Sequence, residues 1–260
     1  MKKQLLDVIF ASDKRKNVLL LLQNGPQEMD ALLNSLDTKR QALLPQMKIL
    51  EEHHFVSHNG DTYELTIIGK LIVEMMLPIL KKIDVLDIDI GYWGNHDFDF
   101  IPSDLLERIG ELRNYEIINP PLIELYEIHK TYHELKISEY VYTAGNIVYP
   151  NYQSRFTEMI GNNITIYYIV SEDLFNKIRT ESYEHLKFFL ESGYFNLYVY
   201  HKKMNFLFFT FDDYHLVMNP LKKDGNIDNK YLICNTEDAL DWGKELFDYY
   251  LRDSTQITKV

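Results

Sequence analysis

The chain has 260 residues, of which 46% are hydrophobic and 25% charged, a composition that is typical of a globular protein and excludes a disordered one. Its formal net charge is −12, and its one cysteine, Cys234, excludes an intramolecular disulfide. The longest apolar stretch, 67–80, is too short and too often interrupted to span a bilayer, and no secretion signal is recognised, so we expect a cytoplasmic protein without a membrane partner.

Three helices are predicted first. Asp13 opens an apolar helix, where its carboxylate is the expected cap of free backbone N–H groups, and Gly25 ends it. A second helix is predicted over 29–36, and a third over 39–53 with Thr38 as its N-cap. The residues expected to form the buried stripe of the third helix are Leu43, Met47 and Leu50.

A hairpin follows the third helix. The strands 55–57 and 62–66 are joined through Asn59-Gly60, a dipeptide that is typical of tight hairpin turns. Three helices and a two-stranded wing predict a winged helix-turn-helix, a module that places one helix in the major groove of double-stranded DNA. The wing tip, His58-Asn59, would lie over the minor groove or the DNA backbone.

Basic and amide side chains lie on the elements expected to meet DNA. Arginine and glutamine pair with base edges, whereas lysine is suited to phosphate. Residues 1–84 have a net charge of zero, so the excess acid lies outside this module. A solvated surface is the alternative for such a face. The predicted DNA-binding residues are Lys14, Arg15, Lys16, Lys39, Arg40, Gln41, Gln46, Lys48, His58 and Asn59.

Two short motifs carry a family resemblance. Residues 50–56 read Leu-Glu-Glu-His-His-Phe-Val, and 63–69 read Tyr-Glu-Leu-Thr-Ile-Ile-Gly. They resemble the winged helices of ArsR-type regulators, except that His54 stands where glycine is usual, which predicts a different turn before the wing. The metal sensors of that family carry a cysteine pair in this module. None is present here, so we expect neither a metal site nor a cofactor.

A connecting region is predicted over 66–138. Residues 66–84 form a helix that is apolar on most sides, which indicates either packing within the chain or the interface of a homodimer that reads two half-sites. We favour the homodimer. The acidic stretch 87–99 is interpreted as a linker strand or loop before a helix over 102–112. His129 and His133 are assigned to an amphipathic helix, because the acid that a zinc motif requires is absent.

After residue 139 the pattern changes to strands alternating with helices. The apolar run 164–170 predicts a central parallel strand, and Ser171 is expected to cap one long helix behind it. The other predicted strands are 140–149, 195–200, 205–211, 215–219 and 230–234, and the other helices are 154–160 and 236–251. This is an α/β domain with a mixed sheet. The expected domains are therefore 1–84, a helical linker 85–138, and 139–260.

A second resemblance covers almost the whole chain. It rests on Leu-Leu-Pro-Gln at 43–46, Tyr-Trp-Gly-Asn-His-Asp at 92–97 and the run from Trp242 to Tyr250. These motifs resemble archaeal methanogenesis-regulatory-type transcriptional regulators. The resemblance implies a winged-helix regulator with a C-terminal sensory domain, makes Pro45 inside the third helix a family feature, and implies no particular ligand.

The C-terminal topology also resembles one half of a phospholipase-D-type domain. Such enzymes need His-x-Lys-x-x-x-x-Asp; His201 and Lys203 fit the pattern, but Phe208 occupies the position of the aspartate. We therefore expect no catalytic residues and no enzyme. A degenerate hydrolase or nuclease and a protein-interaction module are the alternative functions.

An effector site is expected in the C-terminal domain. Ligands of open α/β sheets bind outside the carboxyl ends of parallel strands. A small molecule or peptide is the expected effector, and a solvated rim is the alternative. The acidic charge disfavours an anionic ligand unless Arg155 and Lys203 are drawn together. The predicted effector-binding residues are Tyr149, Arg155, Ser171 and His201.

Overall fold

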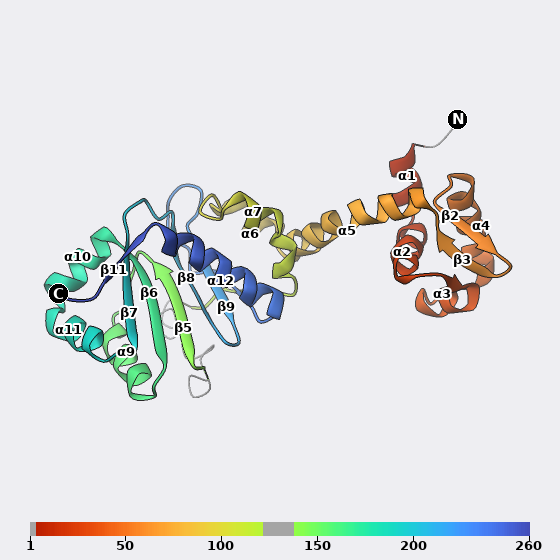
Figure 1. Ribbon diagram of the computed structural model, residues 1–260. Coiled ribbons are helices and arrows are strands. Elements are labelled where there is room, and N and C mark those ends of the chain that lie inside the picture. The colour runs from red at the N-terminus through yellow and green to blue at the C-terminus, as the bar shows by residue number, and fades with distance from the viewer. Residues whose placement is uncertain (1–3, 122–137) are drawn as a thin grey trace. The chain divides into compact units, whose positions relative to one another are not determined.

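The structure, a computed structural model, describes residues 4–121 and 138–260, which divide into two compact units, Met1–Leu80 and Lys81–Val260 (Figure 1). Each unit has its own hydrophobic core. The helix predicted around His129 and His133 lies outside the described residues.

The first unit combines helices with a small sheet. The strand order β1-β3-β2 is antiparallel throughout. The predicted order of three helices and a hairpin is confirmed, with one short helix in front of it. The elements are α1 (Leu5–Phe10), α2 (Asp13–Leu21), η1 (Leu22–Asn24), β1 (Gln27–Glu28), α3 (Met29–Ser35), α4 (Arg40–Glu52), β2 (Val56–Asn59), β3 (Thr62–Leu65) and the start of α5 (Ile67–Ile88).

The predicted stripe of α4 is buried as expected, with Leu43, Met47 and Leu50 all at most 1% exposed. The predicted caps are wrong at two helices. Ser12, not Asp13, caps α2 by accepting a hydrogen bond from the Arg15 N–H, because the cap must precede the helical backbone. Lys39, not Thr38, is the N-cap residue of α4, and its side chain makes no cap hydrogen bond.

The turn before the wing contains a residue with a positive φ. His54 has a φ of 58°, in the left-handed region that favours glycine. A histidine at this position therefore adopts a backbone conformation that glycine adopts at lower cost, and the prediction of a turn unlike that of ArsR-type modules stays a prediction. In the wing itself Asn59 pairs with Thr62, so the two-residue loop is Gly60-Asp61, with Gly60 at a φ of 60°.

A threonine and a glycine fix the start of α5. The Gly69 N–H donates to Thr66 Oγ1 at 3.1 Å, which caps the helix, and the Thr66 hydroxyl donates to the His54 carbonyl. A Cβ on Gly69 would lie 2.1 Å from the Phe55 carbonyl oxygen. The motif Thr-x-x-Gly therefore holds α5 against the turn that precedes the wing.

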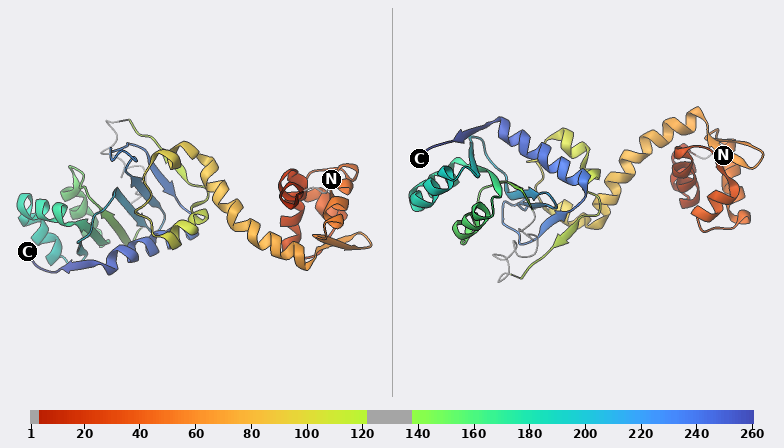
Figure 2. Two further views of the ribbon diagram at one scale, coloured as in Figure 1. Left: turned by 90° about the horizontal axis from the view of Figure 1, so that it is seen from above. Right: turned by 60° about the horizontal axis from the view of Figure 1, so that its bottom comes forward.

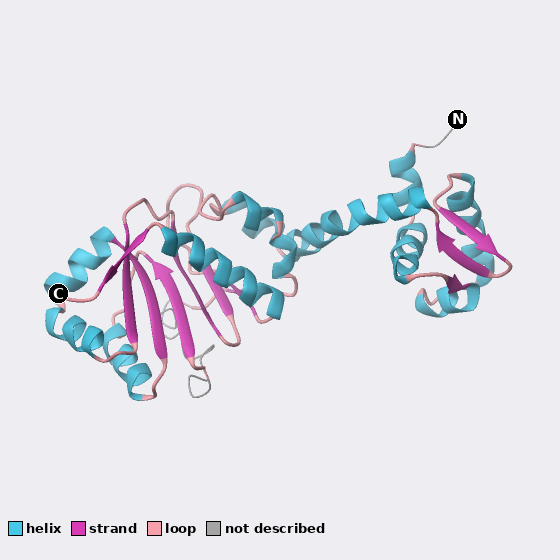
Figure 3. Cartoon of the chain, viewed as in Figure 1, coloured by secondary structure: helices cyan, strands magenta, loops and turns pink. Residues whose placement is uncertain are grey.

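The described part of the second unit is built on an eight-stranded mixed sheet (Figure 3). Its order is β11-β7-β6-β5-β8-β9-β10-β4, and only the β5–β6 and β6–β7 pairs are parallel. The predicted central parallel strand is confirmed as β6. The strands are β4 (Glu116–Ile118), β5 (Tyr140–Gly145), β6 (Thr165–Ser171), β7 (Phe195–Tyr200), β8 (Phe206–Asp212), β9 (Leu216–Pro220), β10 (Tyr231–Cys234) and β11 (Ser254–Ile257).

Helices cover both faces of this sheet (Figure 2). One face packs against α9 (Tyr152–Gly161), α10 (Glu172–Glu181) and α11 (Tyr183–Glu191). The other packs against α12 (Glu237–Arg252) and the short helices α6 (Ile90–Asn95), α7 (Ser103–Glu107) and η2 (Ile109–Leu112). Successive residues of β6 alternate between the two cores, which is why its sequence is apolar on both faces.

Three further predictions differ from the structure. The stretch 87–99 is not a strand or loop throughout, because α5 extends to Ile88 and α6 follows. The helix predicted over 102–112 is two short helices, and the long helix capped by Ser171 breaks at Ser182 into α10 and α11. Ser171 does cap α10, accepting from the Leu174 N–H at 3.3 Å.

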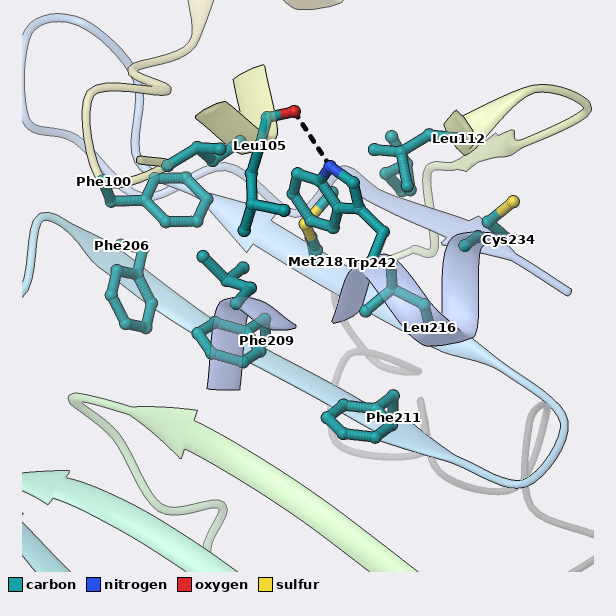
Figure 4. Close-up of a cluster of buried hydrophobic side chains, with 14 of the residues drawn as sticks. Phe100, Leu105, Leu112, Phe206, Phe209, Phe211, Leu216, Met218, Cys234 and Trp242 are labelled. Carbon is teal, nitrogen blue, oxygen red and sulfur yellow. Dashed lines mark hydrogen bonds between the residues drawn. The ribbon is translucent and has the colours of Figure 1, made fainter. Parts of the chain in front are cut away.

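The described part of the expected linker lies in the core of the second unit. Trp242 of α12 is fully buried and donates through Nε1 to the Leu105 carbonyl at 3.0 Å (Figure 4). His96 is also buried, with Nδ1 2.8 Å from the Tyr92 carbonyl and Nε2 3.2 Å from Asp228 Oδ2, although the latter contact lacks hydrogen-bond geometry. We therefore assign this region to the second unit.

Candidate nucleic-acid interface

The outer face of α4 is the candidate DNA-reading surface. The same amphipathic pattern that buries its apolar stripe leaves Gln41, Leu44, Pro45 and Lys48 exposed, one to two turns apart along the helix. An amide, an ammonium and an apolar side chain can contact a base edge, a phosphate and a thymine methyl group, respectively. Pro45 lies on this outer face, and the carbonyl that lacks a helical donor because Pro45 has no N–H is that of Gln41, an exposed residue.

Arg40 joins the beginning of α4 to the loop of the wing. Its guanidinium forms a two-pronged contact with the Asp61 carboxylate, with Nη1 3.0 Å from Oδ2, and Asp30 lies 4.0 Å away. The hydrogen bond that Arg40 donates to Asp61 raises the pKa of Arg40. Both partners are about half exposed, so the guanidinium lies at the surface with much of its charge compensated.

Arg15 is not a surface cation, in contrast to the expectation. It is 5% exposed, and its guanidinium donates to the carbonyls of Asp7 and Val8 at the end of α1. Nη1 also donates to Gln46 Oε1 at 2.6 Å. Arg15 thus ties α1 and α2 to α4, and it holds the half-buried Gln46 side chain by its oxygen. Sequence reasoning missed this role because α1 was not predicted.

The remaining predicted residues lie on three elements. Lys39 and Lys48 on or beside α4 are exposed, whereas Lys14 and Lys16 of α2 are half-buried. Lys16 binds Asp13 at 3.1 Å. In the wing, Asn59 is exposed, and the exposed His58 contacts the Glu51 carboxylate and packs 5.4 Å from the Tyr63 ring. Lys16 and Arg40 are therefore the two predicted cations that are balanced by nearby carboxylates within the described residues.

The predicted effector residues fall into two separate pairs. Tyr149 and Arg155 line one cavity beneath α9. Ser171 and His201 lie at the carboxyl ends of β6 and β7, where His201 contacts Thr255 Oγ1 at 2.9 Å. Lys203 is not among the residues that line the cavity with Arg155. Within the described residues, no group of three or more His, Cys, Asp or Glu side chains could hold a metal ion.

The chain therefore combines a unit with three helices and a hairpin in sequence and a unit built on a mixed sheet with helices on both faces. Residues 3–84 match the family model of the N-terminal domain of methanogenesis regulatory protein FilR1, and residues 125–253 match that of its middle domain. The chain belongs to this family of methanogenesis-regulatory-type archaeal regulators. The motifs that carried the resemblance in the sequence lie in both units.

One curated relative is methanogenesis regulatory protein FilR1 of Methanothrix harundinacea (strain 6Ac). It is 24% identical over 257 residues, which cover 96% of this chain. The chain spans 57% of the length of that relative. No helix within the described ranges has the length and apolar character needed to cross a membrane.

Three solved structures have similar parts, all with TM-scores below 0.5. The structure of TrmBL2, an archaeal chromatin protein, has a TM-score of 0.44 and 12% identity, covering 97% of both chains. Phosphatidylserine synthase from Haemophilus influenzae Rd KW20 has a TM-score of 0.39 and 14% identity, covering 56% of this chain and 40% of its own. Nuc, a phospholipase D family member from Salmonella typhimurium, has a TM-score of 0.37 and 9% identity, covering 55% of this chain and 97% of its own.

Proposed function

We propose that the protein is a sequence-specific DNA-binding transcriptional regulator in the cytoplasm, with a winged helix-turn-helix as its first unit. The observation that supports this function most directly is the outer face of α4, which exposes Gln41, Leu44 and Lys48 beside the wing. Membership of a regulatory family supports it independently. Gln41 and Arg40 are the proposed base readers, and Lys39 and Lys48 the proposed phosphate contacts.

The test is selection of binding sites from random-sequence DNA, followed by fluorescence anisotropy on the selected site and on scrambled DNA. Lys48→Ala is expected to weaken both alike. Gln41→Ala is expected to cost about 1–3 kcal/mol on the selected site only and to relax the preference at one base pair. Equal affinity for selected and scrambled DNA at every salt concentration would refute the proposal.

We infer a homodimer from the surface of α5. Within the first unit, five large apolar side chains of this helix are between 45% and 78% exposed. Four of them recur at every fourth position and so follow one ridge of the helix. Monomeric proteins rarely expose a continuous apolar stripe of this kind. The stripe is Ile67, Ile68, Leu71, Met75 and Ile79.

Light scattering of the wild type and of Leu71→Glu/Met75→Glu tests the dimer. We expect the wild type to be a dimer and the double variant a monomer. The variant is also expected to lose affinity for an operator with two half-sites. Its control is Glu74→Gln, which changes an exposed position of the same helix without adding charge. A wild-type monomer at micromolar concentration would contradict the inference.

The second unit is proposed to sense an effector rather than to catalyse a reaction. Phe208, at the position of the phospholipase-D aspartate, is 4% exposed and packs with Leu207, Val217 and Tyr231. Lys202 binds Asp253 at 2.7 Å, and His201 is exposed at the sheet edge. We expect no cleavage of phosphodiesters; cleavage that His201→Ala abolishes would support the hydrolase instead.

A further inference from the structure

A cavity of about 60 Å³ lies between α9 and the sheet. Its walls are mainly apolar and include Val141 of β5, Phe156 and Met159 of α9, and Phe208 of β8. It lies under α9 and is lined by Tyr149, beyond the carboxyl end of β5, but by neither Ser171 nor His201 at the ends of β6 and β7. An engineered apolar cavity of about 150 Å³ holds benzene, so this one suits a smaller molecule, on the order of two to four carbon atoms plus one polar group.

Among the described residues that line this cavity, Arg155 is the one charged group, and no carboxylate lines it. Arg155 lines the cavity from α9, and its Nη2 is buried without a hydrogen-bond partner in the part of the chain that the structure describes. Burial lowers the pKa of Arg155, and the exposed Glu158 of the same helix opposes that effect from a distance. An unpaired buried guanidinium N–H is costly unless an acceptor takes its hydrogen bond, and an anionic acceptor forms the strongest one.

Other polar groups of the cavity are engaged elsewhere. Thr210 Oγ1 lies 2.8 Å from Thr143 Oγ1 and donates to the Tyr142 carbonyl at 3.0 Å. The Tyr168 hydroxyl donates to the Ile147 carbonyl at 2.9 Å. A ligand therefore meets one unsatisfied cationic donor in an apolar lining, which fits a singly charged anion with an apolar tail. A phosphate dianion would need several more donors than the described lining offers.

We propose that this cavity binds a short aliphatic monocarboxylate, whose carboxylate accepts hydrogen bonds from Arg155 and whose tail packs against Phe156, Met159 and Phe208. This inference deepens the proposed effector role of the second unit and rests on it only for its regulatory consequence. It also explains how a domain of strongly acidic charge accommodates an anion: the binding group is the buried Nη2 of one half-buried arginine, not a basic surface patch.

The experiment is calorimetric titration of the full chain with acetate, propionate and butyrate, each beside its uncharged amide at equal ionic strength. We expect saturable binding of at least one carboxylate and at least tenfold weaker binding of its amide. Arg155→Gln is expected to fold, because it removes a buried unpaired charge, and to lower carboxylate affinity at least tenfold. Arg179→Gln, which changes an exposed arginine of α10, is the matched control and is expected to bind as the wild type does.

Equal binding of acid and amide, unchanged affinity in Arg155→Gln, or no binding of any of the three acids would overturn the proposal. The acid–amide comparison uses the wild type alone, so it stands whether or not a variant folds. DNA affinity is measured in parallel. Carboxylate binding without a change in DNA affinity would support this site and contradict the effector role. A change in DNA affinity with other metabolites, but no carboxylate binding, would support the effector role and contradict this site.

Discussion

At the scale of single residues, the backbone restricts which side chain fits at His54, before the wing, and at Gly69, after it. His54 is held at a φ of 58°, a conformation that costs a non-glycine residue roughly 1–2 kcal/mol. His54→Gly is therefore expected to raise the free energy of unfolding by about 0.5–1 kcal/mol, after the greater freedom of glycine in the unfolded chain is subtracted. Urea denaturation measures this change in the free energy of unfolding. The neighbouring His53, with a φ of −100°, is the control, since His53→Gly is expected to destabilise.

Gly69 has the opposite requirement, which is space. A Cβ at this position would lie 2.1 Å from the backbone oxygen of Phe55, which cannot rotate away as a side chain can. Gly69→Ala is expected to lower the free energy of unfolding by about 1–3 kcal/mol by displacing the start of α5. Gly161→Ala adds the same methyl group where nothing lies within 4 Å, so it is expected to be neutral or slightly stabilising. Equal effects of the two substitutions in thermal melts would contradict the steric explanation.

At the scale of elements, the contact between Arg40 and Asp61 connects α4, the proposed recognition helix, with the wing. The pair is about half exposed, so its loss is expected to change stability by no more than about 1 kcal/mol. Its effect on DNA binding is expected to be larger, because Asp61 places a carboxylate on the surface proposed to meet the DNA phosphates. Asp61→Asn should strengthen binding to scrambled DNA several-fold and increase its salt dependence.

Asp30→Asn is the matched control for Asp61→Asn, because Asp30 lies 4.0 Å from the same guanidinium without a hydrogen bond. We expect a smaller gain in affinity from this control, measured by anisotropy over a salt series. Weaker DNA binding of Asp61→Asn would show instead that the pair holds Arg40 in its reading position.

At the scale of the whole molecule, charge is divided unequally between the units. Residues 1–84 are neutral, and the net charge of −12 lies in the remainder. Repulsion from that remainder is expected to weaken non-specific DNA binding by the full chain relative to a fragment of residues 1–88, which retains its own core and the whole of α5. The difference should shrink between about 0.05 and 0.5 M salt, as the Debye length falls below about 10 Å. A difference that is independent of salt would exclude this electrostatic explanation.

The hydrophobic pattern of the sequence by itself determined many of the helices and strands of this protein. Periodicity identified the buried stripe of α4, the wing, the central strand β6 and the helix α12, because each element buries one face or both over enough residues to leave a clear repeat. Short sequence motifs, among them the runs at 43–46 and 92–97, indicated the family that the comparisons show. Local signals were weaker at ends and breaks, so the caps of α2 and α4 and the break at Ser182 were missed.

Only the tertiary structure decided which side chains meet. The edge strands β4 and β11 contain three and four residues, too few for a recognisable repeat, and exist because distant strands pair with them. Arg15 is buried because α1 packs over it, and Arg40 is compensated because the wing brings Asp61 to it. Arg155 and Tyr149 share a cavity while Ser171 and His201 lie elsewhere. Burial and pairing depend on residues far apart in the chain, and a local pattern does not encode which distant groups fill the space around a side chain.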